Sequence, residues 1–178
     1  MRVPEPLRCL LAVLLLCTAL PAGAHSRSVS YSSWQIDVQG AEVQLRLPLV
    51  ALNPLGLDPR DPKTPAEIAS RVSAGFVLSA GDAACIADGA AARRGEAEIL
   101  VQARWRCPRK PEFLQSSFLL DRIPSHLHLL QLHDGERRSG PWALGSERQR
   151  IDLRPLPAGE APRFGRYLAL GVEHILSG

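Results

Sequence analysis

The chain has 178 residues and a mass of 19.4 kDa, with 46% hydrophobic and 22% charged residues. This length suits one domain with short appendages. A formal net charge of only +3 excludes a strongly basic nucleic-acid-binding protein, and the hydrophobic content excludes a long disordered acidic chain.

Residues 1–24 have the three parts of a secretory signal peptide. Arg2 precedes a nearly continuous apolar run at 7–20, and a Pro-Ala-Gly-Ala segment with small residues follows at 21–24. The run is short for a transmembrane helix, which needs about 20 apolar residues. We therefore expect export and cleavage before His25. Lipid attachment at Cys17 is a weaker alternative, because Leu16 stands where a small residue is expected.

Two cysteines, Cys85 and Cys107, remain after removal of that segment. In an oxidising compartment a single pair is most simply a disulfide. It would close a loop of about 23 residues and stabilise the fold by about 3 kcal/mol. The alternative is a pair of thiolate metal ligands, but the chain lacks the Cys-x-x-Cys spacing typical of such sites.

Alternating apolar residues predict a hairpin from residues 27–38 and 41–49, with a turn at Gln39-Gly40. The apolar phase slips by one residue at Ser32-Ser33, which predicts a bulge or a bend. The serines of residues 26–33 are expected on the solvent face of this strand. They lack the Gly-x-Ser-x-Gly context of a nucleophile.

One helix is expected over residues 65–78, after a proline-rich loop at 53–65. Thr64, Pro65 and Glu67 form the pattern of a capping box with proline at the first helical position. Gly81 is the expected stop.

Further strands are expected at 84–87, 96–106, 113–120 and 126–133, and a last hairpin at 137–144 and 147–153. The predicted fold class is mainly β. We expect an antiparallel β-sandwich or barrel-like domain with one inserted helix over residues 25–155. A Pro/Gly linker follows at 156–163.

Residues 164–178 are apolar at helical spacing and predict the start of a transmembrane helix. Their segment RYLALGVEHILSG resembles the opening of the membrane region of HupE/UreJ-type proteins, which are hydrogenase or urease accessory proteins, some regarded as nickel permeases. The hallmark of that family is His-x-x-x-Gly-x-Asp-His in the first transmembrane helix. Here His174 to Gly178 supply the first part of the motif, and the Asp-His does not follow. The signal peptide and the alternating serines up to Trp34 also resemble the exported domain of larger family members.

The resemblance implies a periplasmic domain, anchored at the inner membrane by the C-terminal helix, with a non-enzymatic accessory or metal-handling role such as nickel delivery or transport in a full-length parent. It places His174 on an ion path, because ionisable groups inside a membrane usually mark one. The alternative is a helix-terminal histidine beside the last carbonyl groups.

His25 is a second candidate metal ligand. At a new N-terminus, its amine and imidazole could chelate copper or nickel, completed by another histidine. His126 and His128 are two residues apart on a predicted strand, so they share a face, and His133 is close by. The alternative is that these three histidines sit among leucines in a half-buried sheet.

Two other functions therefore stay open: a free periplasmic copper- or nickel-binding protein using His25, and a partner-binding β-sandwich without a ligand. We expect no enzymatic activity, because no acid/base pair or nucleophile constellation stands out. We expect no nucleic-acid partner, and the sequence does not indicate an oligomeric state.

Overall fold

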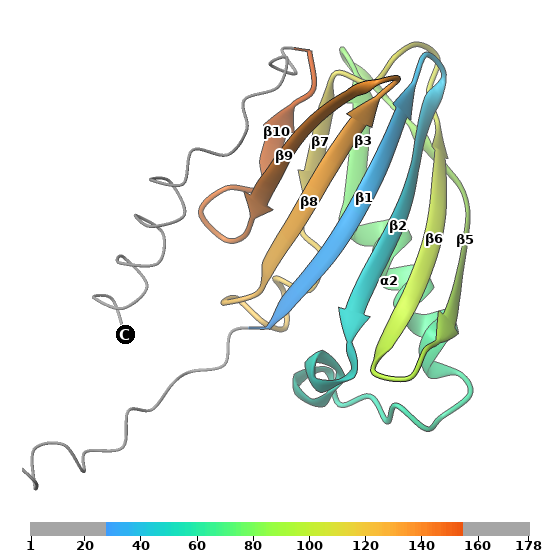
Figure 1. The fold of residues 1–178 in the computed structure, drawn as a ribbon, viewed down its shortest axis with the longest axis vertical. Helices are drawn as coiled ribbons and strands as arrows, with labels where there is room; N and C mark the ends of the chain where they lie inside the picture. Colours follow the sequence, from blue (N-terminus) through green and yellow to red (C-terminus); the bar gives the residue numbers. More distant parts are fainter. Residues whose placement is uncertain (1–27, 155–178) are drawn as a thin grey trace, which may run out of the picture.

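The computed structural model describes residues 28–154, which fold into two β-sheets and one α-helix around a common core. The larger sheet has six strands in the order β5-β6-β2-β1-β8-β9, and the smaller has four in the order β10-β7-β3-β4 (Figure 1). The elements in chain order are β1 (Val29–Asp37), β2 (Gly40–Pro48), the 3-10 helix η1 (Leu49–Leu55), α2 (Thr64–Gly75), β3 (Phe76–Ala80), β4 (Ala83–Ala84), β5 (Ile86–Arg94), β6 (Glu98–Arg106), β7 (Phe113–Ser116), β8 (Leu127–Asp134), β9 (Arg137–Leu144) and β10 (Arg150–Asp152). The predicted mainly β class is confirmed.

The first hairpin forms as predicted, but the predicted bulge is wrong. β1 and β2 pair antiparallel from Tyr31↔Arg46 to Asp37↔Gly40 without a break in register. The apolar phase slips because serines, not apolar residues, occupy the inward positions at the start of β1. Gly40 is needed at the turn, since a Cβ there would collide with the carbonyl oxygen of Trp105 on β6.

The pairing of β1 with β8 corrects the expected antiparallel arrangement. These two strands run parallel, in register from Val29↔Leu127 to Ile36↔Asp134. The larger sheet is therefore mixed, with the hairpin of β1 and β2 inserted between β6 and β8. Strand alternation gives the inward face of each strand but carries no information on the direction of its partner.

The helix begins one residue earlier than expected and ends three residues earlier. Thr64 lies inside α2 and donates its hydroxyl to the carbonyl of Asp58 at 2.7 Å, so the predicted capping box does not form. The chain becomes extended at Phe76. A Cβ at Gly75 would lie 2.9 Å from the Cα of Phe118, so the end of the helix packs closely on that segment. The predicted stop at Gly81 is therefore wrong.

The strands after α2 depart from the prediction in two places. The short strand expected at 84–87 is β4 and the start of β5, and β5 continues to Arg94. The expected last hairpin does not form, because β10 leaves β9 and pairs with β7, with Ile151 opposite Leu114. That position buries Ile151 in the core, and only 4% of it stays exposed.

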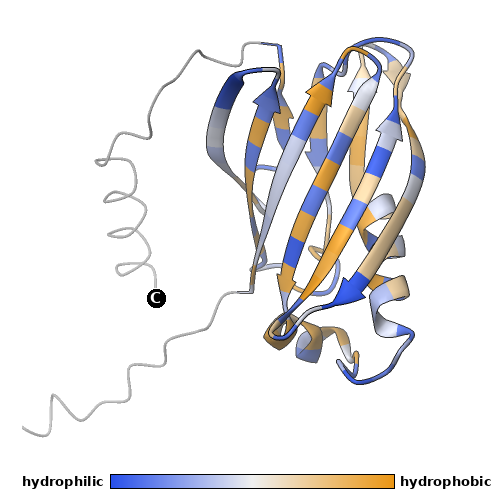
Figure 2. Ribbon diagram, turned by 45° about the vertical axis from the view of Figure 1, so that its right-hand side comes forward, coloured by the Kyte–Doolittle hydropathy of each residue, from blue (hydrophilic) through white to orange (hydrophobic). Residues whose placement is uncertain are grey.

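The core lies between the two sheets and α2. Figure 1 shows β3, β7 and α2 on one side of the larger sheet, and Figure 2 shows hydrophobic and hydrophilic residues alternating along its strands. Trp34, Phe76 and Phe118 are the largest fully buried side chains, and their rings contact one another in series. No helix within residues 28–154 has the length and apolar character needed to cross a membrane. The predicted signal peptide, linker and C-terminal helix lie outside the described residues.

Candidate functional site

Two buried histidines lie against β1 at the beginning of β8. His126 immediately precedes the strand and His128 is its second residue; they are 2% and 1% exposed. The parallel register places His128 beside Ser30, and the amide of Leu127 donates to the carbonyl of Ser28 at 3.0 Å. Because alternate residues of a strand share a face, both imidazoles point to the serines of β1.

The two imidazoles and three serines form one continuous series of hydrogen bonds, which we call the Ser–His chain. Its members are Ser28, His126, Ser30, His128 and Ser32 in that order. The successive distances from oxygen to nitrogen are 3.0, 2.9, 2.6 and 2.8 Å, and each ring uses both of its nitrogens. The indole Nε1 of Trp34 donates to the last serine at 2.8 Å.

The indole sets the direction of the protons along this chain. An indole N–H can only donate, so the Ser32 hydroxyl accepts from Trp34. Its other side-chain partner among the described residues is Nε2 of His128, and we assign the hydroxyl proton to that bond. The His128 ring then carries its proton on Nδ1 and donates to Ser30, which donates to Nε2 of His126. In this assignment both rings are neutral and protonated on Nδ1. No buried side-chain nitrogen or oxygen of the described residues lacks a hydrogen-bond partner.

Burial favours the same neutral state. It lowers the pKa of His126 to about 4, and it lowers the pKa of His128 to about 3, with a smaller contribution from the neighbouring His126. The ring of Phe76 packs edge-on against His128 at 5.0 Å between centroids, and Phe118 packs against His126 at 5.9 Å. An imidazolium here would have no carboxylate to offset its desolvation, since every side-chain hydrogen bond of the two rings goes to a serine.

The predicted metal ligands are only partly brought together. His126 and His128 are neighbours, whereas His133 lies on the opposite face of β8. Within residues 28–154, no three His, Cys, Asp or Glu side chains gather in a way that could hold a metal ion. The ring nitrogens of His126 and His128 are all bonded to hydroxyl groups, so this pair does not fit an open metal site. His25 and His174 lie outside the described residues.

The sequence patterns did not lead us to expect that serines of β1 are buried beside the histidines. Ser30 is 0% and Ser32 is 8% exposed, so the expected solvent-facing position of this serine run is wrong for both. A signal was available in the spacing. Ser28, Ser30 and Ser32 repeat every second residue, as do His126 and His128, and two such polar rows on neighbouring strands can satisfy each other.

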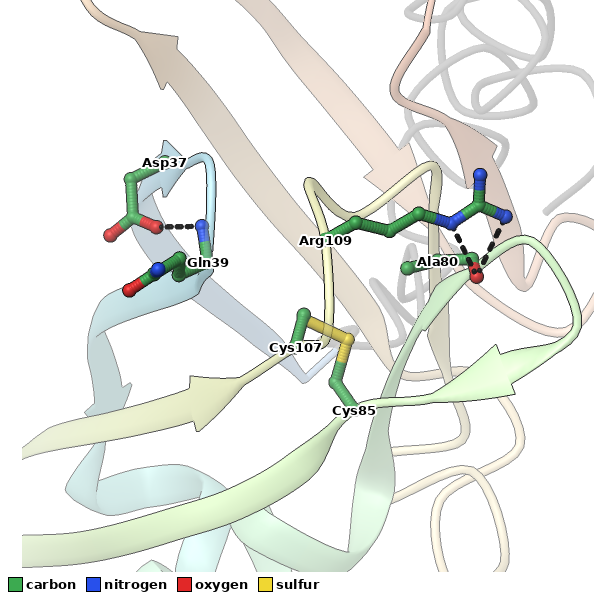
Figure 3. Close-up of a disulfide and its surroundings, with 6 residues drawn as sticks. All are labelled: Asp37, Gln39, Ala80, Cys85, Cys107 and Arg109. Atoms are coloured by element: carbon green, nitrogen blue, oxygen red, sulfur yellow. Dashed lines mark hydrogen bonds between the residues drawn. A yellow bond between two sulfur atoms is a disulfide. The ribbon is translucent and has the colours of Figure 1, made fainter.

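The predicted disulfide between Cys85 and Cys107 is confirmed (Figure 3). Cys85 lies between β4 of the smaller sheet and β5 of the larger, and Cys107 follows β6. Ile86 pairs with Arg106, so the two cysteines continue the β5–β6 ladder by one position. The bond therefore fixes the point where the chain crosses from one sheet to the other.

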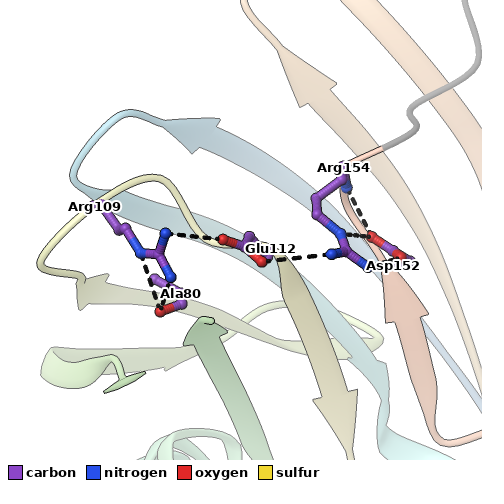
Figure 4. Close-up of polar contacts among 5 residues, drawn as sticks. All are labelled: Ala80, Arg109, Glu112, Asp152 and Arg154. Carbon is purple, nitrogen blue, oxygen red and sulfur yellow. Dashed lines mark hydrogen bonds and ion pairs between the residues drawn. The ribbon is translucent and has the colours of Figure 1, made fainter. Parts of the chain in front are cut away.

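A second polar cluster lies near the end of β10 (Figure 4). Arg109 donates to the carbonyl of Ala80 at 3.1 and 3.3 Å and pairs with Glu112 at 3.3 Å. Glu112 also lies 3.8 Å from Arg154, whose guanidinium donates to Asp152 and lowers the pKa of that carboxyl to about 2. These contacts connect the segment before β7 to β3 and to the segment after β10, so we assign them a role in the stability of the fold.

The sequence comparisons give no family for this chain. No protein-family model matches it, and no curated protein matches it in a sequence search.

Proposed function

We propose that residues 28–154 form the exported, non-enzymatic accessory domain of a HupE/UreJ-like membrane protein, held at the periplasmic face of the inner membrane by the helix expected at 164–178. The observation that carries the proposal is the Cys85–Cys107 disulfide. Such bonds persist in oxidising compartments and are rare in the cytosol. The signal-like residues 1–24 support the same location.

The Ser–His chain supports a structural rather than a catalytic role for its residues. A catalytic serine must reach a substrate, and Ser30 is fully buried and hydrogen-bonded to two imidazoles. Trp34, at the inner end of the chain, is also fully buried. The network instead joins β1 to β8 within the larger sheet, and its imidazoles pack against Phe76 and Phe118.

The metal-handling part of the proposal rests on the family resemblance, and we assign it to His25 and His174. His126 and His128 are excluded from it because their ring nitrogens are bonded to serines. Calorimetric titration of the exported chain with nickel or copper chloride tests the N-terminal ligand. Adding one residue before His25 should abolish chelation by its amine. Equal affinity with the extra residue would remove His25 from the proposal.

Fractionation of bacteria that produce the full chain tests the proposed location. We expect the protein in the inner membrane, resistant to alkaline carbonate extraction. In spheroplasts, added protease should remove the domain, because it faces the periplasm. As a control, a variant with Leu14→Arg and Leu15→Arg, which interrupts the apolar run, should stay in the cytosol and be protected. A wild-type chain that is protected and carbonate-soluble would contradict the proposal.

A further inference from the structure

The outward face of the larger sheet carries a groove of about 680 Å³ that the proposed function does not use. It extends over β1, β2, β6 and β5. The strand register arranges its outward side chains in two adjacent rows across these four strands. One row is Ser33, Gln44, Gln102 and Ala91, and the other is Tyr31, Arg46, Leu100 and Arg93.

The first row presents two free amides. Gln44 and Gln102 are directly opposite each other and exposed, and neither side chain is hydrogen-bonded to any other described residue. Each amide offers both a donor and an acceptor. Ser33 adds a hydroxyl at the end of the row, while Ala91 leaves the other end open.

The second row joins an aromatic ring to an ion pair. Tyr31 is 50% exposed, so its ring can stack against a ligand. Arg46 donates twice through Nε to the two oxygens of Glu98, at 3.0 Å each, and once through Nη2 at 2.7 Å. In this pair the carboxylate can still accept and the guanidinium can still donate. Leu100 lies between Arg46 and Arg93 in the row and adds an apolar surface.

This combination matches a neutral polyhydroxylated ligand. Sugar hydroxyls need donors and acceptors side by side, and the C–H faces of a pyranose need an aromatic or aliphatic surface. A phosphate-bearing ligand would need several free cations, yet Arg46 is paired and only Arg93 remains among the described residues that line the groove. A lipid would need a continuous apolar lining, which the amides and the ion pair interrupt.

The geometry points to a glycan-binding site on this face, in which Gln44, Gln102 and the Arg46–Glu98 pair bind the hydroxyls of a neutral oligosaccharide and Tyr31 stacks on one of its rings. The site is independent of the proposed membrane anchoring and of metal handling.

Nuclear magnetic resonance tests this inference on the isotope-labelled full chain, purified without sugar-based detergents. Maltohexaose, cellohexaose and chitohexaose serve as probes, each added to about 5 mM, a range that detects the weak affinities typical of a shallow site. We expect at least one of them to cause saturable shifts of amide signals at Tyr31, Gln44 and Gln102. If none of the three causes saturable shifts, or if the shifts map to another face, the inference is wrong.

Substitutions identify the residues that bind. Gln102→Ala and Tyr31→Ala should each weaken binding about tenfold or more, equivalent to at least about 1.4 kcal/mol. The matched control is Gln115→Ala, because Gln115 is an exposed glutamine of β7 in the smaller sheet, outside the groove. It should bind like the wild type. Affinities of all three variants within twofold of the wild type would contradict the assigned site, and unchanged spectra without sugar would show that the variants fold.

Discussion

The hydroxyl of Ser30 lies between two imidazoles and is bonded to both, 2.9 Å from Nε2 of His126 and 2.6 Å from Nδ1 of His128. The residue is fully buried, so bulk solvent cannot replace a lost partner. A buried polar atom that loses its partner keeps the whole cost of its desolvation. The stability of the Ser–His chain therefore depends on this side chain more than on any other serine of β1.

Replacing Ser30 by alanine should lower the free energy of unfolding by about 2–3 kcal/mol, because a donor on one imidazole and an acceptor on the other lose their partner together. Urea denaturation monitored by tryptophan fluorescence measures the change. Ser33→Ala is the control, since Ser33 lies on the same strand but on the outward face, and it should change stability by less than about 0.5 kcal/mol. Equal effects of the two substitutions would contradict a stabilising Ser–His chain.

The neutral histidines should make stability depend on pH. An unfolded chain protonates its histidines near pH 6.5, whereas the native pKa values are about 4 for His126 and about 3 for His128. Between the native and unfolded pKa values the unfolded state binds more protons, so stability falls as the pH decreases below about 6.5 and is fully present above it. From about pH 7 to pH 5, each histidine should reduce the free energy of unfolding by about 2 kcal/mol.

Urea denaturation at the two pH values measures this loss, and ring nitrogen shifts in nuclear magnetic resonance report the protonation state directly. Both rings should remain neutral and protonated on Nδ1 at pH 5. The buried, non-titrating Leu130 provides the control, because Leu130→Ala should reduce stability equally at both pH values. A cationic imidazole in the folded protein at pH 5 would refute the proposed proton arrangement.

The histidine pair was partly predictable from the sequence, because residues two apart on a strand share a face. The surroundings of the pair were indicated only by the matching two-residue spacing of the serines, which does not say which strands are neighbours. Nothing local indicates that β8 lies beside β1. The serines of β1 are inward because they alternate in phase with Trp34 and Ile36. A polar row on a strand is normally assigned to solvent, and a second buried polar row reverses that assignment.

At the scale of elements, local patterns predicted which helices and strands form better than the residues at which they end. The hairpin of β1 and β2 follows its alternation closely, and β9 has the expected bounds of Arg137–Leu144. The end of α2 does not follow from its helical spacing, because Phe76 and Leu78 continue that spacing while pairing as β3 with β7. Tertiary pairing overrides helix propensity there. The partner of β10 is likewise decided by the long-range burial of Ile151.

The disulfide fixes the passage between β4 and β5, and its removal should destabilise the whole fold. Cys85 and Cys107 are 22 positions apart, and opening a loop of this size should lower the free energy of unfolding by about 3 kcal/mol. We expect this for the double substitution Cys85→Ala and Cys107→Ala, measured by urea denaturation. Dithiothreitol should lower the wild-type midpoint and leave that of the double variant unchanged. A wild-type midpoint that dithiothreitol does not affect would contradict this role.

At the scale of the whole molecule, two sheets and one helix share a core. Two connections stabilise this arrangement, one covalent and one made of hydrogen bonds. The disulfide joins the chain at the β4–β5 crossing, and the Ser–His chain joins β1 to β8 inside the larger sheet. The outward face of that sheet carries the groove of the proposed glycan site.

The intact mass and N-terminal sequence of the chain recovered from the bacterial envelope test the central claim, export of a disulfide-closed domain, most directly. The account predicts a chain that begins at His25, with Cys85 and Cys107 resistant to alkylation until a reductant is added. A chain that retains Met1 and has both thiols free to react in the denatured, unreduced protein would contradict it.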